Sequence, residues 1–344
     1  MAAVLAEPRD RIWDEITELG LEKYVADMDH DGFCTLPPEI ANPNNLAGRL
    51  LDALVDLAEK RNGERPDLET GATHAYQPKF LYGAKNERYG RSQLKDQTPA
   101  LKSPADLGKE DSPFGDRMHS IFYDDPVFAE GLMNPPLLAL VTYLLGYSAV
   151  LSNIGCWMKG PNKSNFPLHT DSGGLPSPFP PQAYAAQCTY LLTDFTRENG
   201  ATAIVPGSHK YGRAPVGPET ILAENDKAIP IEGPAGSLVV WHGNAWHAAY
   251  NRTAPGLRVS VTVYFNRPFM RPLENFIGKI PEGMLEELID KHGPRVAMVL
   301  QQGCIPGYST QGDRVSFTAK AEKYIEAYED ASGVNTRDKD NPFH

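Results

Sequence analysis

The sequence predicts a mainly β fold with flanking helices. Between residues 148 and 269, short apolar runs alternate with glycine and proline turns, a pattern typical of an antiparallel β-sandwich or barrel. On both sides of this stretch, apolar residues recur at helical spacing. No linker separates these parts. We therefore expect one domain over residues 1–344, with a mostly helical part (1–147), a β core (148–269) and a C-terminal helical part (270–344).

The clearest strand of the predicted core runs from Arg258 to Phe265. Apolar and polar residues alternate along it, with Val259, Val261, Val263 and Phe265 between Arg258, Ser260, Thr262 and Tyr264. Because successive side chains on a strand point to opposite faces, one face suits an apolar core and the other a polar cavity. Residues 184–192 and 237–241 predict two further strands.

Several helices are predicted outside the core. Apolar residues repeat at helical spacing over residues 45–61, and Asn62-Gly63 ends this helix. Asn134-Pro135 is typical of a helix start, and Gly146 ends that helix. Further helices are expected around residues 284–289 and 319–327. Residues 63–118 have no clear period, so they form either a substrate-covering region or a plain surface excursion.

Composition limits the partners. Lys+Arg is 33 and Asp+Glu is 44, for a net charge of −11, which disfavours binding to nucleic acid and to anionic membranes. The four cysteines form no CxxC pair, so neither a disulfide framework nor a zinc ribbon is expected, and a reduced compartment fits best. The start lacks the basic region of a secretory signal, and the apolar run 137–145 is too short to span a bilayer. We expect a cytoplasmic protein that acts on a small molecule; the sequence leaves the oligomeric state open.

A candidate metal site begins with His169-Thr170-Asp171. Residues two apart on a strand face the same side, so the imidazole and the carboxylate can converge, although a lone His-x-Asp is common by chance. A turn and a strand at 236–241 then lead to His247, 76 positions after Asp171. Two imidazole nitrogens and one carboxylate suit iron(II) and leave coordination positions open, whereas a structural zinc site is usually closed by four protein ligands. His242 is a rival third ligand, but the spacing to Arg258 favours His247.

Arg258 lies 11 positions after His247, on the polar face of its strand. A guanidinium there can clamp a carboxylate through two parallel hydrogen bonds, and Ser260 on the same face can donate another. This suits a dicarboxylate co-substrate such as 2-oxoglutarate. The alternative interpretation is an arginine in a surface ion pair.

The order of these motifs resembles that of the phytanoyl-CoA dioxygenase superfamily. The motifs are His169-Thr170-Asp171, Asn199-Gly200-Ala201-Thr202, Pro206-Gly207-Ser208-His209, Gly236-Ser237, His247, Asn251-Arg252-Thr253, Arg258 and Tyr264. The match is strong over residues 148–269, and residues 22–36 resemble the opening helix and first strand of that family. The resemblance implies a double-stranded β-helix (jelly-roll) core, Fe(II), and 2-oxoglutarate converted to succinate and CO2 as O2 is consumed.

The resemblance also assigns roles. It implies that His169, Asp171 and His247 are the iron ligands and that Arg258 binds the distal carboxylate of 2-oxoglutarate. Because related halogenases carry alanine or glycine at the position of Asp171, the carboxylate favours hydroxylation, desaturation or cyclisation over halogenation.

Secondary contacts to 2-oxoglutarate depart from the family pattern. Some relatives place an aromatic residue where this chain has Thr189, with Gln187 on the same face of the strand. Some also carry a hydroxyl residue where this chain has Ala249. Thr189, Gln187 and Ser260 are therefore the expected secondary contacts.

The expected function is the oxidation of an unactivated C–H bond in a small, largely apolar metabolite. The sequence leaves two other classes of function open. A metal-dependent hydrolase would use the His/Asp site to activate water, and it would need no 2-oxoglutarate. A catalytically silent jelly-roll binding protein would use neither the metal nor the co-substrate.

Overall fold

The computed structural model describes residues 8–62, 65–71, 115–172, 174–281, 283–305, 307, 309–334 and 336. Most of the predicted substrate-covering region, residues 63–118, lies outside these ranges. Its last residues form a short strand, β2 (Asp116–His119), which the sequence analysis did not predict.

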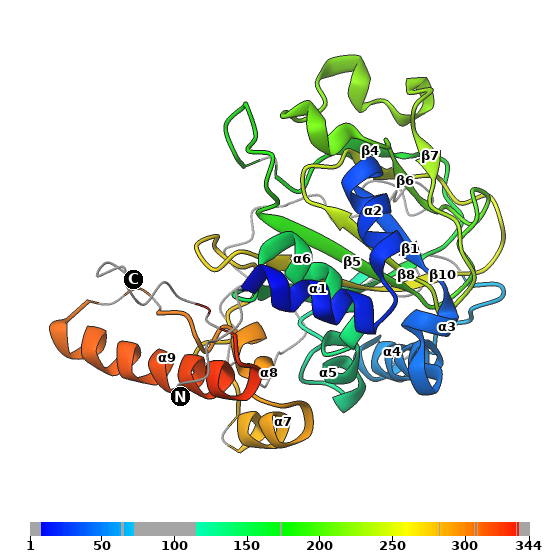
Figure 1. The fold of residues 1–344 in the computed structure, drawn as a ribbon. Coiled ribbons are helices and arrows are strands. Elements are labelled where there is room, and N and C mark those ends of the chain that lie inside the picture. Colours follow the sequence, from blue (N-terminus) through cyan, green and yellow to red (C-terminus); the bar gives the residue numbers. More distant parts are fainter. Residues whose placement is uncertain are drawn as a thin grey trace.

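Two antiparallel sheets form the core (Figure 1). The larger has the order β1 (Phe33–Leu36), β8 (Leu238–His242), β5 (Ala185–Leu191), β10 (Arg258–Asn266), β3 (Val150–Lys159) and β2. The smaller has the order β4 (Phe166–His169), β9 (His247–Ala249), β6 (Thr202–Ile204) and β7 (Ile229–Pro230). From β3 to β10 the chain passes repeatedly between the sheets, which gives the expected double-stranded β-helix.

Helices cover the outer face of the larger sheet. The amino-terminal part contains α1 (Pro8–Glu18), α2 (Glu22–Asp31), α3 (Pro38–Ala41), η1 (Pro43–Asn45), α4 (Leu46–Asn62), α5 (Pro126–Leu132) and α6 (Pro135–Leu145). Helix α6 packs on β5 and β8, α1 packs on α6, and α2 packs on β1 (Figure 1). Three short 3-10 helices, η7 (Ser208–Tyr211), η8 (Gly217–Thr220) and η9 (Leu222–Glu224), lie between β6 and β7 in the chain.

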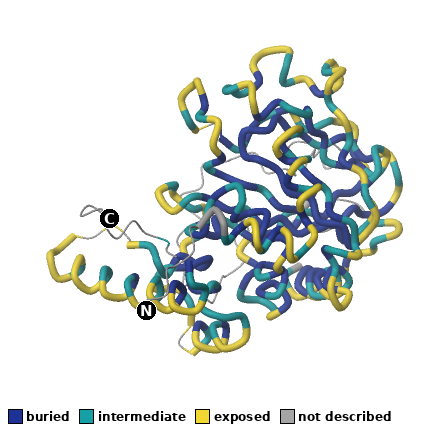
Figure 2. The backbone as a smooth tube through the Cα atoms, in the orientation of Figure 1, coloured by how far each residue is buried: buried dark blue, intermediate teal, exposed yellow. Residues whose placement is uncertain are grey.

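The carboxyl-terminal helices are α7 (Met284–His292), α8 (Arg295–Val299) and α9 (Gln311–Ser332). Helix α8 contacts β3, whereas α9 extends away from the sheets and is largely exposed (Figures 1 and 2). No helix in the described part of the chain is by itself long and apolar enough to cross a membrane. Helices α5 and α6 taken together have sufficient length and apolar character, but the pair is bent by 50°.

Strand β10 shows why this sequence forms the core. Its four apolar residues are at most 1% exposed and pack beneath the helices; they are Val259, Val261, Val263 and Phe265. Burying each such side chain contributes roughly 1.5–3 kcal/mol before the entropy cost of folding. The predicted alternation is confirmed, and it leaves the polar residues of β10 facing the interior of the barrel.

One helix start differs in detail from the expectation. Helix α6 does begin after Asn134, but the Asn134 side chain forms no capping bond. Its amide instead donates to the carbonyl oxygen of Ala41 at 2.9 Å and to the hydroxyl of Tyr190 at 3.0 Å. Because this side chain is 2% exposed, tertiary hydrogen bonds to α3 and β5 take the place of the local cap.

Candidate active site

The structure brings His169, Asp171 and His247 together. Their candidate ligand atoms all lie within 4.8 Å of one another, and His247 Nε2 is 3.7 Å from Asp171 Oδ1. Within the described ranges, no other group of three or more His, Cys, Asp or Glu side chains has a metal-binding arrangement.

Strand pairing positions the two histidines, and a turn positions the aspartate. His169 ends β4 and lies directly opposite His247, the first residue of β9. Asp171 lies beyond the end of β4, where its backbone N–H donates to the carbonyl of Gly243 at 3.0 Å. The three side chains converge as predicted. The reason given for Asp171, alternation along a strand, was wrong, because β4 has already ended there.

Both imidazoles leave Nε2 available as a metal ligand. Nδ1 of His169 lies 3.1 Å from the carbonyl of Pro167, and Nδ1 of His247 lies 3.1 Å from that of Ala245. A carbonyl only accepts hydrogen bonds, so each Nδ1 carries the proton and each Nε2 keeps a free lone pair. Burial lowers the pKa of His169 and of His247 to about 4, so both rings are neutral at pH 7.

Asp171 completes a ligand set that fits a divalent cation. Burial raises the pKa of its carboxyl to about 6, although His169 and Trp241 oppose the shift. Its Oδ2 is buried without a hydrogen-bond partner among the described residues. A buried carboxylate is costly unless a cation and hydrogen bonds compensate its charge. Together with two free Nε2 atoms, it suits the two-histidine, one-carboxylate type of non-haem iron site.

The inner face of the larger sheet looks toward this cluster. Tyr264 of β10 places its hydroxyl 3.4 Å from the carbonyl oxygen of Asp171. Residues directly opposite each other on antiparallel strands share a face. Gln187 is opposite Tyr264, and Thr189 is opposite Thr262, two residues along the same face. The Oε1 of Gln187 and the Oγ1 of Thr189 are buried and have no hydrogen-bond partner among the described residues.

Arg258 and Ser260 lie farther along the same face of β10, and both are buried. The Arg258 guanidinium stacks over Phe195 at 4.5 Å and donates to the carbonyl of Gly200. Its Nε has no partner, and no carboxylate forms an ion pair with it among the described residues. The surface ion pair considered above is therefore not what the structure shows. Burial lowers its pKa to about 9, which still leaves the guanidinium charged at pH 7.

Lys159 is an inner-face cation that the sequence analysis did not assign to the site. It lies directly opposite Arg258 in the pairing of β3 with β10, and it is fully buried. Its Nζ donates to the carbonyl of Tyr250 at 2.5 Å. Burial, followed by the charge of Arg258, lowers the pKa of Lys159 well below its usual value. The sequence shows a lysine within the predicted β core. Only the register between β3 and β10 shows that this lysine lies opposite Arg258.

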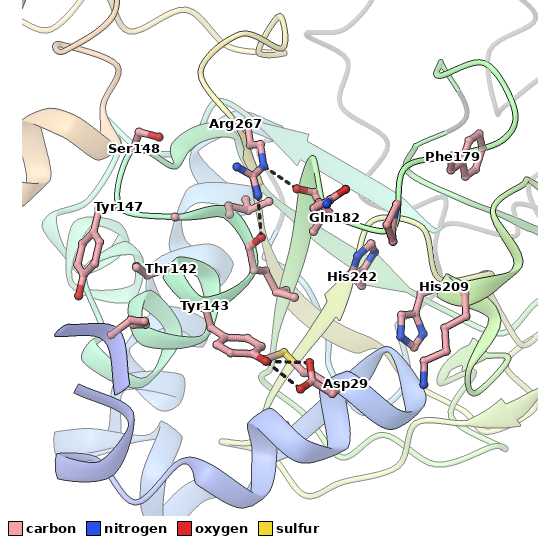
Figure 3. A pocket seen from close by; sticks show the side chains of 18 of the residues that line it. Asp29, Thr142, Tyr143, Tyr147, Ser148, Phe179, Gln182, His209, His242 and Arg267 are labelled. Carbon is pink, nitrogen blue, oxygen red and sulfur yellow. Dashed lines mark hydrogen bonds between the residues drawn. The ribbon is translucent and has the colours of Figure 1, made fainter. Parts of the chain in front are cut away.

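His242 is separated from the triad. It occupies the outer face of β8, where its Nδ1 accepts a hydrogen bond from the backbone of Asn244 at 3.0 Å. It lines a cavity of about 880 Å³ with His209, Asp29 and Tyr143 (Figure 3). Phe179 lines this same outer cavity. The rival ligand choice is therefore excluded by geometry.

Comparison with known proteins places the chain among oxygenases. Residues 87–260, about half of the chain, match the phytanoyl-CoA dioxygenase (PhyH) family. The dioxygenase af480 of Aspergillus fumigatus is 33% identical over 202 residues, which cover 58% of this chain and 62% of the relative. The uncharacterized protein Rv1501 of Mycobacterium tuberculosis is 28% identical over 184 residues, which cover 47% of this chain and 60% of the relative. The chain thus spans less than two thirds of the length of these relatives.

A solved structure is also similar. HygX from Streptomyces hygroscopicus, crystallised with nickel and 2-oxoglutarate, aligns with a TM-score of 0.49 and 14% identity, over 73% of this chain and 88% of HygX. The family match rests on the sequence itself and includes His169, Asp171, His247 and Arg258. The chain therefore belongs to the phytanoyl-CoA dioxygenase family.

Proposed function

We propose that the protein is an Fe(II)/2-oxoglutarate-dependent dioxygenase. It hydroxylates, desaturates or cyclises an unactivated C–H bond of a small metabolite while 2-oxoglutarate is converted to succinate and CO2. One observation carries the proposal: two neutral imidazoles and one carboxylate lie within 4.8 Å of one another. Family membership supports the same activity.

The residues divide into two groups by task. His169, Asp171 and His247 would hold the iron, which with 2-oxoglutarate and O2 would supply the oxidising power for C–H chemistry. Arg258 and Lys159 form a buried basic pair at one end of the inner face of the larger sheet, with no acidic partner among the described residues. A dicarboxylate that reaches from the metal toward this end would compensate both charges.

Other residues near the cluster limit the type of reaction but do not identify the substrate. The carboxylate of Asp171 favours hydroxylation, desaturation or cyclisation over halogenation, because related halogenases lack that side chain. The inner face near the cluster carries Gln187 and Tyr264 as well as Trp241, so the wall offers polar and aromatic contacts together. A largely apolar substrate and a location in the cytoplasm both stay predictions. A hydrolase would leave the Arg258–Lys159 pair without a role.

The test is succinate formation from 2-oxoglutarate, measured with and without Fe(II) on the full chain. His247→Ala should reduce the rate at least about a hundredfold, because it removes a metal ligand. His242→Ala is the matched control, since that histidine lies on the outer face of β8, and it should retain the activity. Succinate formation that persists in H247A, or that needs no Fe(II) in the parent protein, would contradict the proposal.

A further inference from the structure

The indole of Trp241 lies beside the candidate metal ligands, although it comes from the opposite sheet. Trp241 is on β8, opposite Gln187 of β5, and therefore on the inner face. Its ring centroid is 5.1 Å from that of His247, and the side chain is 4% exposed. The position alone is compatible with simple packing in the core.

Two unpartnered atoms distinguish this indole from a packing residue. Nε1 of Trp241 can only donate a hydrogen bond, and Oδ2 of ionised Asp171 can only accept one. Both atoms are buried, and neither has a partner among the described residues. Leaving a buried polar group without a partner costs roughly 1–3 kcal/mol, so a hydrogen bond between this donor and this acceptor would remove both costs. The Trp241 side chain also lies within reach of the Asp171 carboxyl group.

We propose that Trp241 is a positioning residue for the metal site, whose indole N–H donates to Oδ2 of Asp171. This leaves Oδ1, the oxygen nearer to His247, for the metal. The inference rests on the proposed function. It adds a residue outside the ligand triad that sets the orientation of one ligand, as outer hydrogen bonds do in metal sites generally.

A second tryptophan provides a contrast within the same chain. Trp246 directly precedes His247 and is also buried, at 3% exposed. Its Nε1 donates to the carbonyl of Arg213 at 2.8 Å, so its hydrogen-bonding capacity is already used away from the triad. Of these two indoles, only that of Trp241 has a donor free for Asp171.

The experiment compares Trp241→Phe with Trp246→Phe. Each variant keeps an aromatic ring and loses one indole N–H. We would measure the affinity of the metal-free full chain for Co(II) by calorimetry, and the visible absorption of the bound Co(II), which reports on the ligand field. W241F should bind Co(II) about 10- to 100-fold more weakly and shift the absorption bands. W246F should match the parent protein in both measurements.

The outcomes separate this inference from the proposed function. If the parent protein binds Co(II) and W241F binds it equally well with unchanged bands, the positioning role is wrong and the proposed function stands. Equal weakening in W241F and W246F would also overturn the role, because it would reflect general destabilisation. If the parent protein binds no metal and forms no succinate, the proposed function fails, and this inference fails with it.

Discussion

At the scale of single residues, the pairing of Lys159 with Arg258 is the least ordinary feature of the interior. Both side chains are buried, they face each other across β3 and β10, and neither forms an ion pair among the described residues. Two buried cations repel each other and lose their hydration. We infer that this arrangement favours a bound dianion, which would stabilise the charged forms of both side chains.

Replacing either cation by methionine tests this interpretation. Arg258→Met should raise the KM for 2-oxoglutarate by about 10- to 100-fold, because it removes charge-assisted hydrogen bonds. Lys159→Met should raise that KM by about tenfold and also raise the melting temperature of the ligand-free protein, because it removes a buried amine whose charged form burial and Arg258 disfavour. Steady-state kinetics with Fe(II) saturating, together with thermal melting, would check both effects. A KM that neither substitution moves would show that 2-oxoglutarate binds elsewhere.

The same residues show what a sequence can and cannot predict. The convergence of His169, Asp171 and His247 was predictable from the order of their motifs along the chain, and the inward face of Arg258 from the alternation along its strand. Lys159 was not, because its role depends on which residue of β3 lies opposite Arg258. That register is set by long-range pairing, and no local pattern records it.

At the scale of elements, the end of β8 supports the metal site through its backbone. The carbonyl of Gly243 accepts hydrogen bonds from the N–H groups of Asp171 and Ser172, at 3.0 and 3.2 Å. Gly243 also approaches β5 closely, since a Cβ placed on it would lie 2.8 Å from the carbonyl oxygen of Ala185. This close contact requires glycine, and it keeps the turn that carries Asp171 in place.

Gly243→Ala should therefore weaken metal binding, although Gly243 is not itself a metal ligand. The added methyl group pushes the end of β8 away from β5, at a cost of about 1–3 kcal/mol, and moves the carbonyl that holds Asp171. Gly174→Ala is the control, because a Cβ there meets nothing within 4 Å. Co(II) affinity and thermal stability would be measured for both. Equal affinities in the two variants would show that the turn does not depend on β8.

Among the elements, periodic segments were predictable and short ones were not. Strand β10 and helix α4 matched their expected ranges closely because alternation and helical spacing are local signals. Strand β2 has only four residues and exists because it pairs with β3 at the edge of the sheet. Its neighbours along the chain gave no sign of that partner.

At the scale of the whole molecule, the core joins the three predicted parts of the chain. One cluster of buried apolar residues includes Ile12, Val259 and Val334. We propose on this basis that residues 1–344 form a single domain, as the absence of a linker in the sequence suggested.

The stability of the metal-free protein should depend on pH through its buried histidines. Burial lowers the pKa of His242 to about 4, against an unfolded value near 6.5. The unfolded chain therefore binds a proton that the folded protein does not. Stability is fully present above pH 6.5 and falls by up to about 3 kcal/mol as the pH drops to 4. His169 and His247 act in the same direction, whereas the raised pKa of Asp171 partly offsets them between about pH 6 and pH 4.

Urea unfolding of the metal-free protein at pH 7, 5.5 and 4.5 would measure this dependence. His242→Phe isolates one contribution, because it removes a titrating group that lies away from the metal ligands. Its unfolding free energy should fall less steeply with acid than that of the parent protein. Identical slopes in the two proteins would mean that His242 does not stay neutral in the folded state.

The hydrogen bonds of the two ligand imidazoles have a further consequence. Each ring donates from Nδ1 to the carbonyl located two residues earlier in its own chain segment, Pro167 for His169 and Ala245 for His247. Turning either ring would break that bond, so the backbone fixes the direction of the coordinating nitrogens before any ion arrives. We therefore expect that an ion removed by a chelator can bind again without any change in the orientation of the two rings.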